Sequence, residues 1–143
     1  MTVKEYLKQA FILNKIIKAK QSRIQDLRET QSSVRTPNLG VRVQTSRKAD
    51  PIGDITAVII DLINECQKDI ARLLDLQREI ESLINRVERQ DYRLILYERY
   101  VNLKRWEDIA WDNNYSLRMV HKLHGFGLNL LKECIEVHPL DVV

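Results

Sequence analysis

Apolar residues recur at alternating steps of three and four positions along the first 90 residues of this chain. One row runs from Val3 to Leu27, and a second runs from Ile52 to Val87. Steps of three and four keep side chains on one face of an α-helix, as in coiled coils. The pattern therefore predicts two long helices, the second spanning about residues 51–89.

Local signals mark where these helices begin. Thr2 and Glu5 have the spacing of a capping box, and Asp50 followed by Pro51 suits an N-cap and the first helical position. Residues 30–50, between the two rows, are polar and basic and include Pro37 and Gly40. We expect these residues to form a flexible basic linker.

The second apolar row is wider than pairing with one helix requires, which predicts a further partner. A helix of about 39 residues also cannot satisfy its apolar face within a small globule. We therefore expect the two helices to fold back as an antiparallel hairpin, and the surplus face to pair with a second chain in a homodimer. The extra apolar residues are Val58, Ile63, Ile70, Leu74 and Ile84.

Lys20 and Asp69 interrupt the two apolar rows. We expect each to lie at a solvated edge of its helix, where a charge carries little cost. The alternative is that the two side chains meet and fix the register of the helices.

The segment from Asp91 to Glu133 has the pattern of a helix-turn-helix. Trp106, Ile109 and Ala110 share one helical face, and Asn113-Asn114 suits a tight turn because Asn tolerates left-handed backbone angles. Ser116 is a suitable N-cap for the helix that follows.

The helix after Ser116 has an apolar side and a polar side. Leu117, Val120 and Leu123 are expected to hold it to the body of the domain. The other side bears Arg118, His121 and Lys122, residue types that contact phosphates and base edges in the major groove.

These residues resemble region four of bacterial sigma factors, the helix-turn-helix that docks on the promoter −35 element. The resemblance covers the last third of the chain and rests on Trp106-Glu-Asp-Ile-Ala110, Tyr115-Ser116 and Arg118-Met-Val-His-Lys-Leu-His124. The whole layout is similar to short prophage proteins of the ArpU type, proposed late-gene or muramidase-export regulators. Gly125 and Gly127 depart from this pattern, so the recognition helix is expected to end or bend near Gly125.

Charge is unevenly distributed along the chain. Residues 1–50 hold eleven Lys and Arg against four Asp and Glu, residues 51–90 five against eight, and residues 91–143 seven against eight. The basic N-terminal part is therefore a candidate for phosphate contacts, although its charge is also explained by pairing with the acidic second helix. The predicted DNA-contacting residues are Arg42, Arg47, Lys48, Arg105, Ser116, Arg118, His121 and Lys122.

Motifs for catalysis, nucleotides or cofactors are absent from the sequence. His121, His124, Cys134 and His138 have helical spacing, but this set more simply reflects unrelated side chains than a zinc site. Glu107 and Asp108 are read as helix-starting charges rather than an acid–base pair. Trp106 is expected in the core, and Trp111 is expected to be partly exposed.

The sequence thus predicts an all-α protein: a long antiparallel helical hairpin (residues 1–89, with linker 30–50) followed by a C-terminal helix-turn-helix domain (residues 90–143). We expect a transcriptional regulator that binds duplex DNA as a homodimer, is not an enzyme, and is cytoplasmic, with no cofactor, metal or membrane association. Two alternatives remain: a phage DNA-packaging small subunit, and an adaptor that binds RNA polymerase or a sigma factor.

Overall fold

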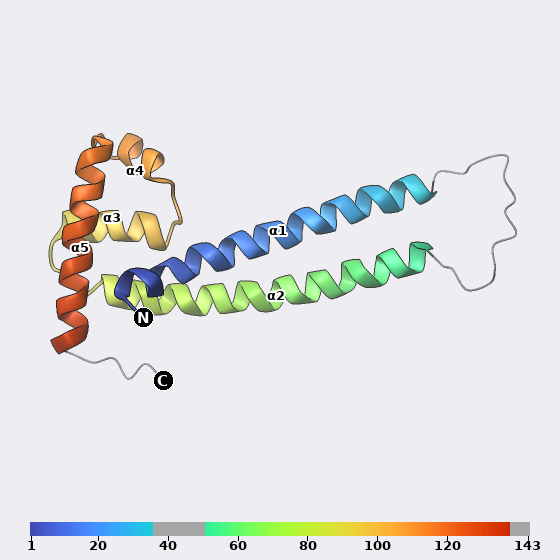
Figure 1. The fold of residues 1–143 in the computed structure, drawn as a ribbon, viewed down its shortest axis with the longest axis horizontal. Coiled ribbons are helices and arrows are strands. Elements are labelled where there is room, and N and C mark those ends of the chain that lie inside the picture. The colour runs from blue at the N-terminus through green and yellow to red at the C-terminus, as the bar shows by residue number, and fades with distance from the viewer. Residues whose placement is uncertain (36–50, 138–143) are drawn as a thin grey trace, which may run out of the picture. The chain divides into compact units, whose positions relative to one another are not determined.

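The computed structural model describes residues 1–35 and 51–137, and the regular structure within these ranges is entirely helical (Figure 1). This agrees with the predicted all-α class. The helices are α1 (Val3–Arg35), α2 (Pro51–Ile84), α3 (Gln90–Tyr100), α4 (Trp106–Asp112) and α5 (Leu117–Val137).

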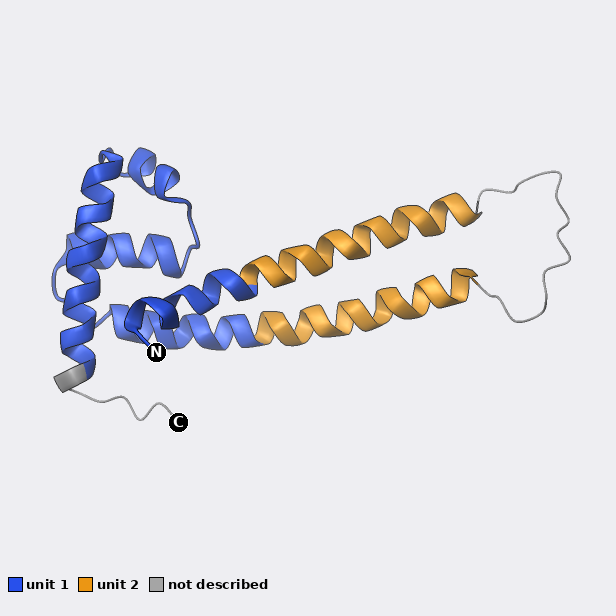
Figure 2. Ribbon diagram, in the orientation of Figure 1, with its two compact units in different colours: residues 1–13, 72–143 blue, residues 14–71 orange. Residues whose placement is uncertain are grey.

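The chain divides into two compact units (Figure 2). Unit 1 comprises residues 1–13 and 72–143, and unit 2 comprises residues 14–71. Both α1 and α2 therefore contribute one end to each unit. The division of the chain into residues 1–89 and 90–143 stays a prediction.

The expected capping box at Thr2 and the start of the second long helix at Pro51 are confirmed, while Asp50, the predicted N-cap, lies outside the described residues. The backbone N–H of Glu5 donates to Thr2 Oγ1 at 3.2 Å, and the backbone N–H of Thr2 donates to Glu5 Oε2 at 2.8 Å. This reciprocal capping box satisfies two N–H groups that a helix start leaves without a partner. Pro51 is the first residue of α2, where its missing N–H costs nothing.

In unit 2, α1 and α2 run antiparallel. Gln31 donates to Thr56 Oγ1 at 2.6 Å, while Lys20 contacts Asp69 further along α2. A later residue of α1 therefore faces an earlier residue of α2. Between these contacts lies an apolar core that contains Ile24, Leu27, Ile59 and Cys66.

The expectation that Lys20 and Asp69 lie at separate solvated edges was wrong, because the two side chains contact each other. Lys20 Nζ lies 2.6 Å from Asp69 Oδ2 and 3.4 Å from Glu65 Oε2. Asp69 is only 8% exposed. Each residue breaks the apolar row of its helix at the same level of the antiparallel pair, so the two charges face each other. The hydrogen bond to Asp69 raises the pKa of Lys20 and favours its charged form.

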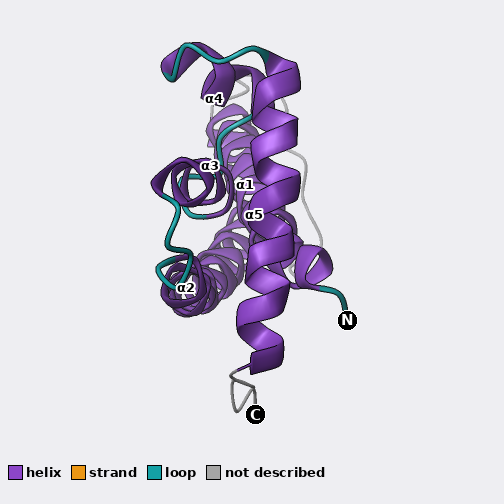
Figure 3. Cartoon of the chain, turned by 90° about the vertical axis from the view of Figure 1, so that its left-hand side faces the viewer, coloured by secondary structure: helices purple, strands orange, loops and turns teal. Residues whose placement is uncertain are grey.

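In unit 1, α5 packs against α3 and α4 (Figure 3). α5 approaches α3 closely at Gly127, where a Cβ atom would lie 3.0 Å from Leu96 Cδ1. Gly127 therefore lets α5 cross α3 closely. The fully buried side chains of this unit include Leu7, Ile80, Ile84, Ile95, Leu96, Tyr100, Ile109, Val120 and Leu131.

Three predicted boundaries need correction. Residues 30–35 belong to α1, so the segment predicted as linker 30–50 is helical at its start. The second long helix ends at Ile84 rather than near residue 89, with a tight turn in which the N–H of Val87 donates to the carbonyl of Ile84. The helix after Ser116 does not end near Gly125 but continues to Val137, with Gly127 packed against Leu96.

Candidate nucleic-acid interface

The turn between α4 and α5 is built by the residues expected from the sequence. Asn114 has a left-handed backbone (φ 57°), and the N–H of Tyr115 donates to the carbonyl of Ala110 at 2.9 Å. Ser116 Oγ accepts from the N–H of Met119 at 3.1 Å, which is the contact of an N-cap. The turn is thus closed by hydrogen bonds at both ends, and it starts α5 at Leu117.

A small apolar core fixes α4 and α5 to α3. Ile109 and Ala110 on α4 pack with Val120 and Leu123 on α5, and Ile95 supplies the contact from α3. Leu117, which was expected to join this core, is 43% exposed, so that assignment was wrong. The buried stripe of α5 instead follows Val120, Leu123, His124, Gly127 and Leu131.

The opposite side of α5 is exposed and basic. Arg118, His121 and Lys122 are all exposed, as is Ser116 at the start of the helix. Arg118 and Lys122 are four residues apart and therefore neighbours on one helical face. The sequence from Asn113 to Leu131 contains no Asp or Glu. The first half of α5 thus offers positive charge without a nearby acid on the same helix.

Some other cations of unit 1 are paired with carboxylates. Arg89 contacts Asp91 at 2.9 Å, and Lys104 contacts both Glu98 at 2.6 Å and Asp112 at 3.0 Å. No ion pair of Arg118 or Lys122 occurs within residues 1–35 and 51–137. These two side chains therefore remain available to bind an anion.

Arg105, which was predicted to contact DNA, lies directly before α4 and pairs with Asp108 at 3.1 Å. Its guanidinium lowers the pKa of Asp108, so this carboxylate stays ionised at neutral pH. Glu107 and Asp108 lie in the first turn of α4, where negative charge is favourable for the helix.

A series of cation–π and ring contacts connects α1, α3, α4 and α5 within unit 1. The guanidinium of Arg99 lies 4.1 Å from the ring centroid of Phe11 and 4.2 Å from that of Trp106. The Trp106 ring in turn lies 4.8 Å from the His121 ring and 4.6 Å from the His124 ring. Trp106 is half-buried by these contacts, and His121 is packed against it at the edge of the basic face.

His124 was not foreseen as a core residue. It is 6% exposed, and Nε2 lies 2.6 Å from the hydroxyl of Tyr100. Burial, together with the charges of Lys4 and Arg99, lowers the pKa of His124 to about 4. The spacing of His124 from Val120 could have placed it in the core, since the two are four residues apart on one face.

The set His121, His124, Cys134 and His138, which was not expected to be a zinc site, lies only in part within the described residues. Within residues 1–35 and 51–137, no three His, Cys, Asp or Glu side chains lie close enough together to hold a metal ion. His138 lies outside the described residues, as do Arg42, Arg47 and Lys48.

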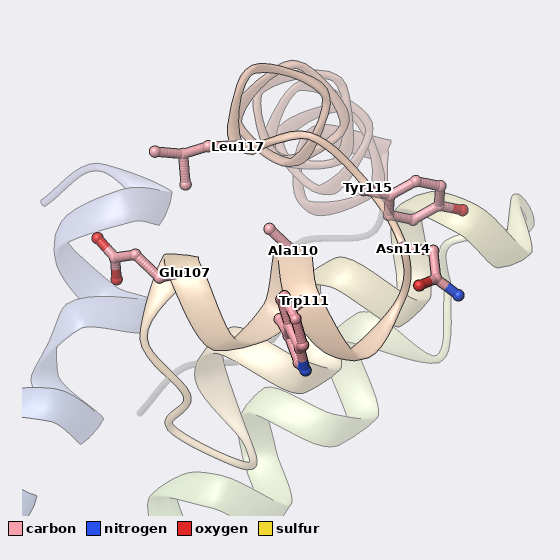
Figure 4. Close-up of a pocket in the computed structure, with 6 residues that line it drawn as sticks. All are labelled: Glu107, Ala110, Trp111, Asn114, Tyr115 and Leu117. Atoms are coloured by element: carbon pink, nitrogen blue, oxygen red, sulfur yellow. The ribbon is translucent and has the colours of Figure 1, made fainter.

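A shallow pocket of about 330 Å³ lies beside the α4–α5 turn (Figure 4). Trp111 is exposed at 84%, as expected, and forms one side of the pocket. Figure 4 shows Glu107 and Leu117 on the side away from Tyr115. The exposed lining of the pocket is mainly apolar.

Comparisons with known proteins assign no family. No family model, curated protein or solved structure matches this chain. Among the helices of residues 1–35 and 51–137, none has both the length and the apolar character needed to cross a bilayer.

Proposed function

We propose that this protein binds duplex DNA and regulates transcription, with α4 and α5 acting as a helix-turn-helix and α5 as its recognition helix. In this proposal, residues 90–143 form a DNA-binding domain similar to sigma region four. They follow a helical hairpin, as in prophage proteins of the ArpU type.

The observation that carries this proposal is the exposed pair Arg118 and Lys122. A recognition helix presents its N-terminal residues to base edges and phosphates. Both cations lie in the first two turns of α5, and neither forms an ion pair with a carboxylate in the described part of the chain. Paired cations such as Arg105 would have to give up a carboxylate before they could bind a phosphate.

The charges suggest separate roles for these two residues. Arg118 can donate two parallel hydrogen bonds to a guanine, which is the commonest specific contact in the major groove. Lys122 has a compact ammonium suited to a phosphate. We therefore assign sequence recognition to Arg118 and backbone attraction to Lys122, with Ser116 and His121 at the edges of the contact.

The test is to select binding sites from fragmented genomic DNA and then to measure the affinity of variants at several salt concentrations. Arg118→Ala should lose about 1–3 kcal/mol on the selected site and little on random DNA. Lys122→Ala should weaken both and reduce the salt slope by about one. Lys132→Ala is the matched control, because Lys132 is an exposed lysine in the second half of α5.

Two results would count against this proposal. If the wild-type protein selects no DNA, duplex binding is not its function. If Lys132→Ala weakens binding as much as Arg118→Ala does, the first half of α5 is not the recognition surface.

Trp111 favours one second candidate, an adaptor that binds RNA polymerase or a sigma factor. A tryptophan exposed at 84% beside an apolar pocket is typical of a protein-binding site. Trp111→Ala should then abolish capture of the purified polymerase while leaving DNA affinity unchanged. An unchanged capture of polymerase by Trp111→Ala would remove this candidate.

A further inference from the structure

Arg99, on α3, contacts two aromatic rings that come from different helices. Its guanidinium carbon lies 4.1 Å from the centroid of the Phe11 ring on α1 and 4.2 Å from that of the Trp106 ring on α4. No ion pair of Arg99 with a carboxylate occurs within residues 1–35 and 51–137. A planar guanidinium packs on aromatic faces, whereas a lysine ammonium is a compact charge. These contacts therefore depend on the shape of the arginine as well as on its charge.

Arg99 also holds the segment that leads into α4. Its Nη1 donates to the carbonyl of Lys104 at 2.8 Å, two residues before Trp106 begins α4. Leu103, in the same connection, has a left-handed backbone (φ 55°), which residues other than glycine seldom adopt. One side chain thus contacts both the ring of Trp106 and the backbone that precedes it.

Trp106 connects this arrangement to α5. Its ring centroid lies 4.6 Å from that of His124 and 4.8 Å from that of His121. His124 is buried and is held by the hydroxyl of Tyr100, so its position does not depend on Trp106 alone. His121 is exposed, and no hydrogen bond of its ring occurs within the described ranges. The contact with Trp106 is therefore what orients the His121 ring.

We propose that Arg99 is a positioning residue for the DNA-contacting face of α5, because it holds Trp106 against His121 and is itself supported by Phe11. The consequence for DNA rests on the proposed function, whereas the orientation of His121 can be measured without DNA. Phe11 belongs to α1 and lies in the same compact unit as residues 72–143. The contact surface on α5 thus depends on a residue outside the proposed domain of residues 90–143.

The first experiment follows the His121 ring by NMR in the full chain without DNA. The ring current of Trp106 shifts the Cε1 proton of His121, and His121→Gln identifies its resonance. Arg99→Lys keeps the charge but removes the planar group, so the resonance should move toward that of an exposed histidine. Phe11→Leu should move it in the same direction, because it removes the other ring that holds the guanidinium. Unchanged helical circular dichroism shows that both variants are folded.

Two control variants separate positioning from a general loss of stability. Ile12→Ala truncates an apolar residue of α1 next to Phe11, but Ile12 is 58% exposed and takes no part in the ring contacts. Ile84→Val removes a methyl group from a fully buried residue of the same unit. Both controls should leave the resonance of His121 in place.

The second experiment measures the affinity for the selected DNA site. Arg99→Lys should lower it by about 2- to 5-fold, the equivalent of one cation–π contact, while Ile84→Val should not change it. Arg99 is also a cation that could contact a phosphate directly. In His121→Ala, Arg99→Lys should have no further effect, because Arg99 acts through the His121 ring.

The proposal is overturned if the His121 resonance stays in place in Arg99→Lys or in Phe11→Leu, or if either control moves it as far. It is equally overturned if Arg99→Lys leaves the DNA affinity unchanged, or lowers it as much in His121→Ala as in the wild type. A wild type that selects no DNA contradicts the proposed function instead, and the NMR comparison then still decides whether Arg99 positions His121.

Discussion

Ser116 combines a stabilising contact with a position at the start of the basic face. Its hydroxyl accepts from the N–H of Met119, so Ser116→Ala should lower the free energy of unfolding by about 1 kcal/mol. Ser116→Asp should retain stability, because a carboxylate also caps a helix. The same carboxylate should weaken DNA binding by repelling phosphates. Urea denaturation and DNA titration measure the two effects separately.

One result would contradict the placement of Ser116 beside DNA phosphates. If Ser116→Asp binds DNA as tightly as the wild type, the start of α5 does not face phosphates. Thr30→Asp provides a control for the added charge, since Thr30 is an exposed residue of α1 that belongs to unit 2, whereas Ser116 belongs to unit 1.

His124 makes stability depend on pH. Its pKa is lowered from 6.5 to about 4 in the folded protein, so below pH 6.5 the unfolded chain takes up a proton that the folded chain does not. The free energy of unfolding should therefore fall as the pH decreases from about 6.5 to about 4, by at most roughly 3 kcal/mol. Above pH 6.5 the ring is neutral in both states and contributes nothing to this dependence.

The measurement is urea denaturation across this pH range for the wild type and His124→Gln. The variant loses the titrating ring, so its stability should change less between pH 6.5 and 4. Equal slopes for the two proteins would show that another group causes the dependence.

At the scale of a helix, the two glycines of α5 form a natural comparison. A Cβ at Gly125 meets nothing within 4 Å, so Gly125→Ala should stabilise the protein by about 1 kcal/mol through helix propensity. At Gly127 the added methyl would lie 3.0 Å from Leu96, which is fully buried and cannot move aside freely. Gly127→Ala should therefore be less stable than Gly125→Ala by about 1 kcal/mol or more. Thermal denaturation of both variants tests this order.

Helix starts were predictable because their signals are local. Thr2, Pro51 and Ser116 each act on backbone groups within four residues, and all three helices begin where expected. Helix ends were less predictable. Gly127 lies inside α5, where a Cβ would come within 3.0 Å of Leu96 on another helix. Nothing near Gly127 in the sequence indicates that neighbour.

In the candidate DNA-binding surface, too, the features set by local sequence were predictable and those set by tertiary contacts were not. The exposed position of Arg118 and Lys122 follows from helical periodicity alone. The pairing of Arg105 with Asp108, the stacking of Arg99 on Trp106, and the contact of Lys20 with Asp69 depend on which side chains meet after folding. Counting charges along the sequence does not distinguish Arg105, which forms an ion pair, from Arg118 and Lys122, which do not.

For the whole molecule, the homodimer expected from the wide apolar row of residues 51–89 predicts that stability depends on concentration. A dimer unfolds to two chains, so the melting temperature of the wild type should rise with protein concentration. Circular dichroism melts over a hundred-fold concentration range test this, and a constant wild-type melting temperature would contradict it.

The two tryptophans of the chain lie on the same short helix but in different environments. Trp106 contacts Arg99 and two histidine rings, whereas Trp111 is 84% exposed. Acrylamide should therefore quench the fluorescence of Trp111 more strongly than that of half-buried Trp106 in the folded protein, and this difference should disappear on unfolding. With Trp111→Phe, the remaining emission reports the packing of α4 alone. With Trp106→Phe, it reports whatever covers the α4–α5 turn, so the protein carries its own optical probe for a bound partner.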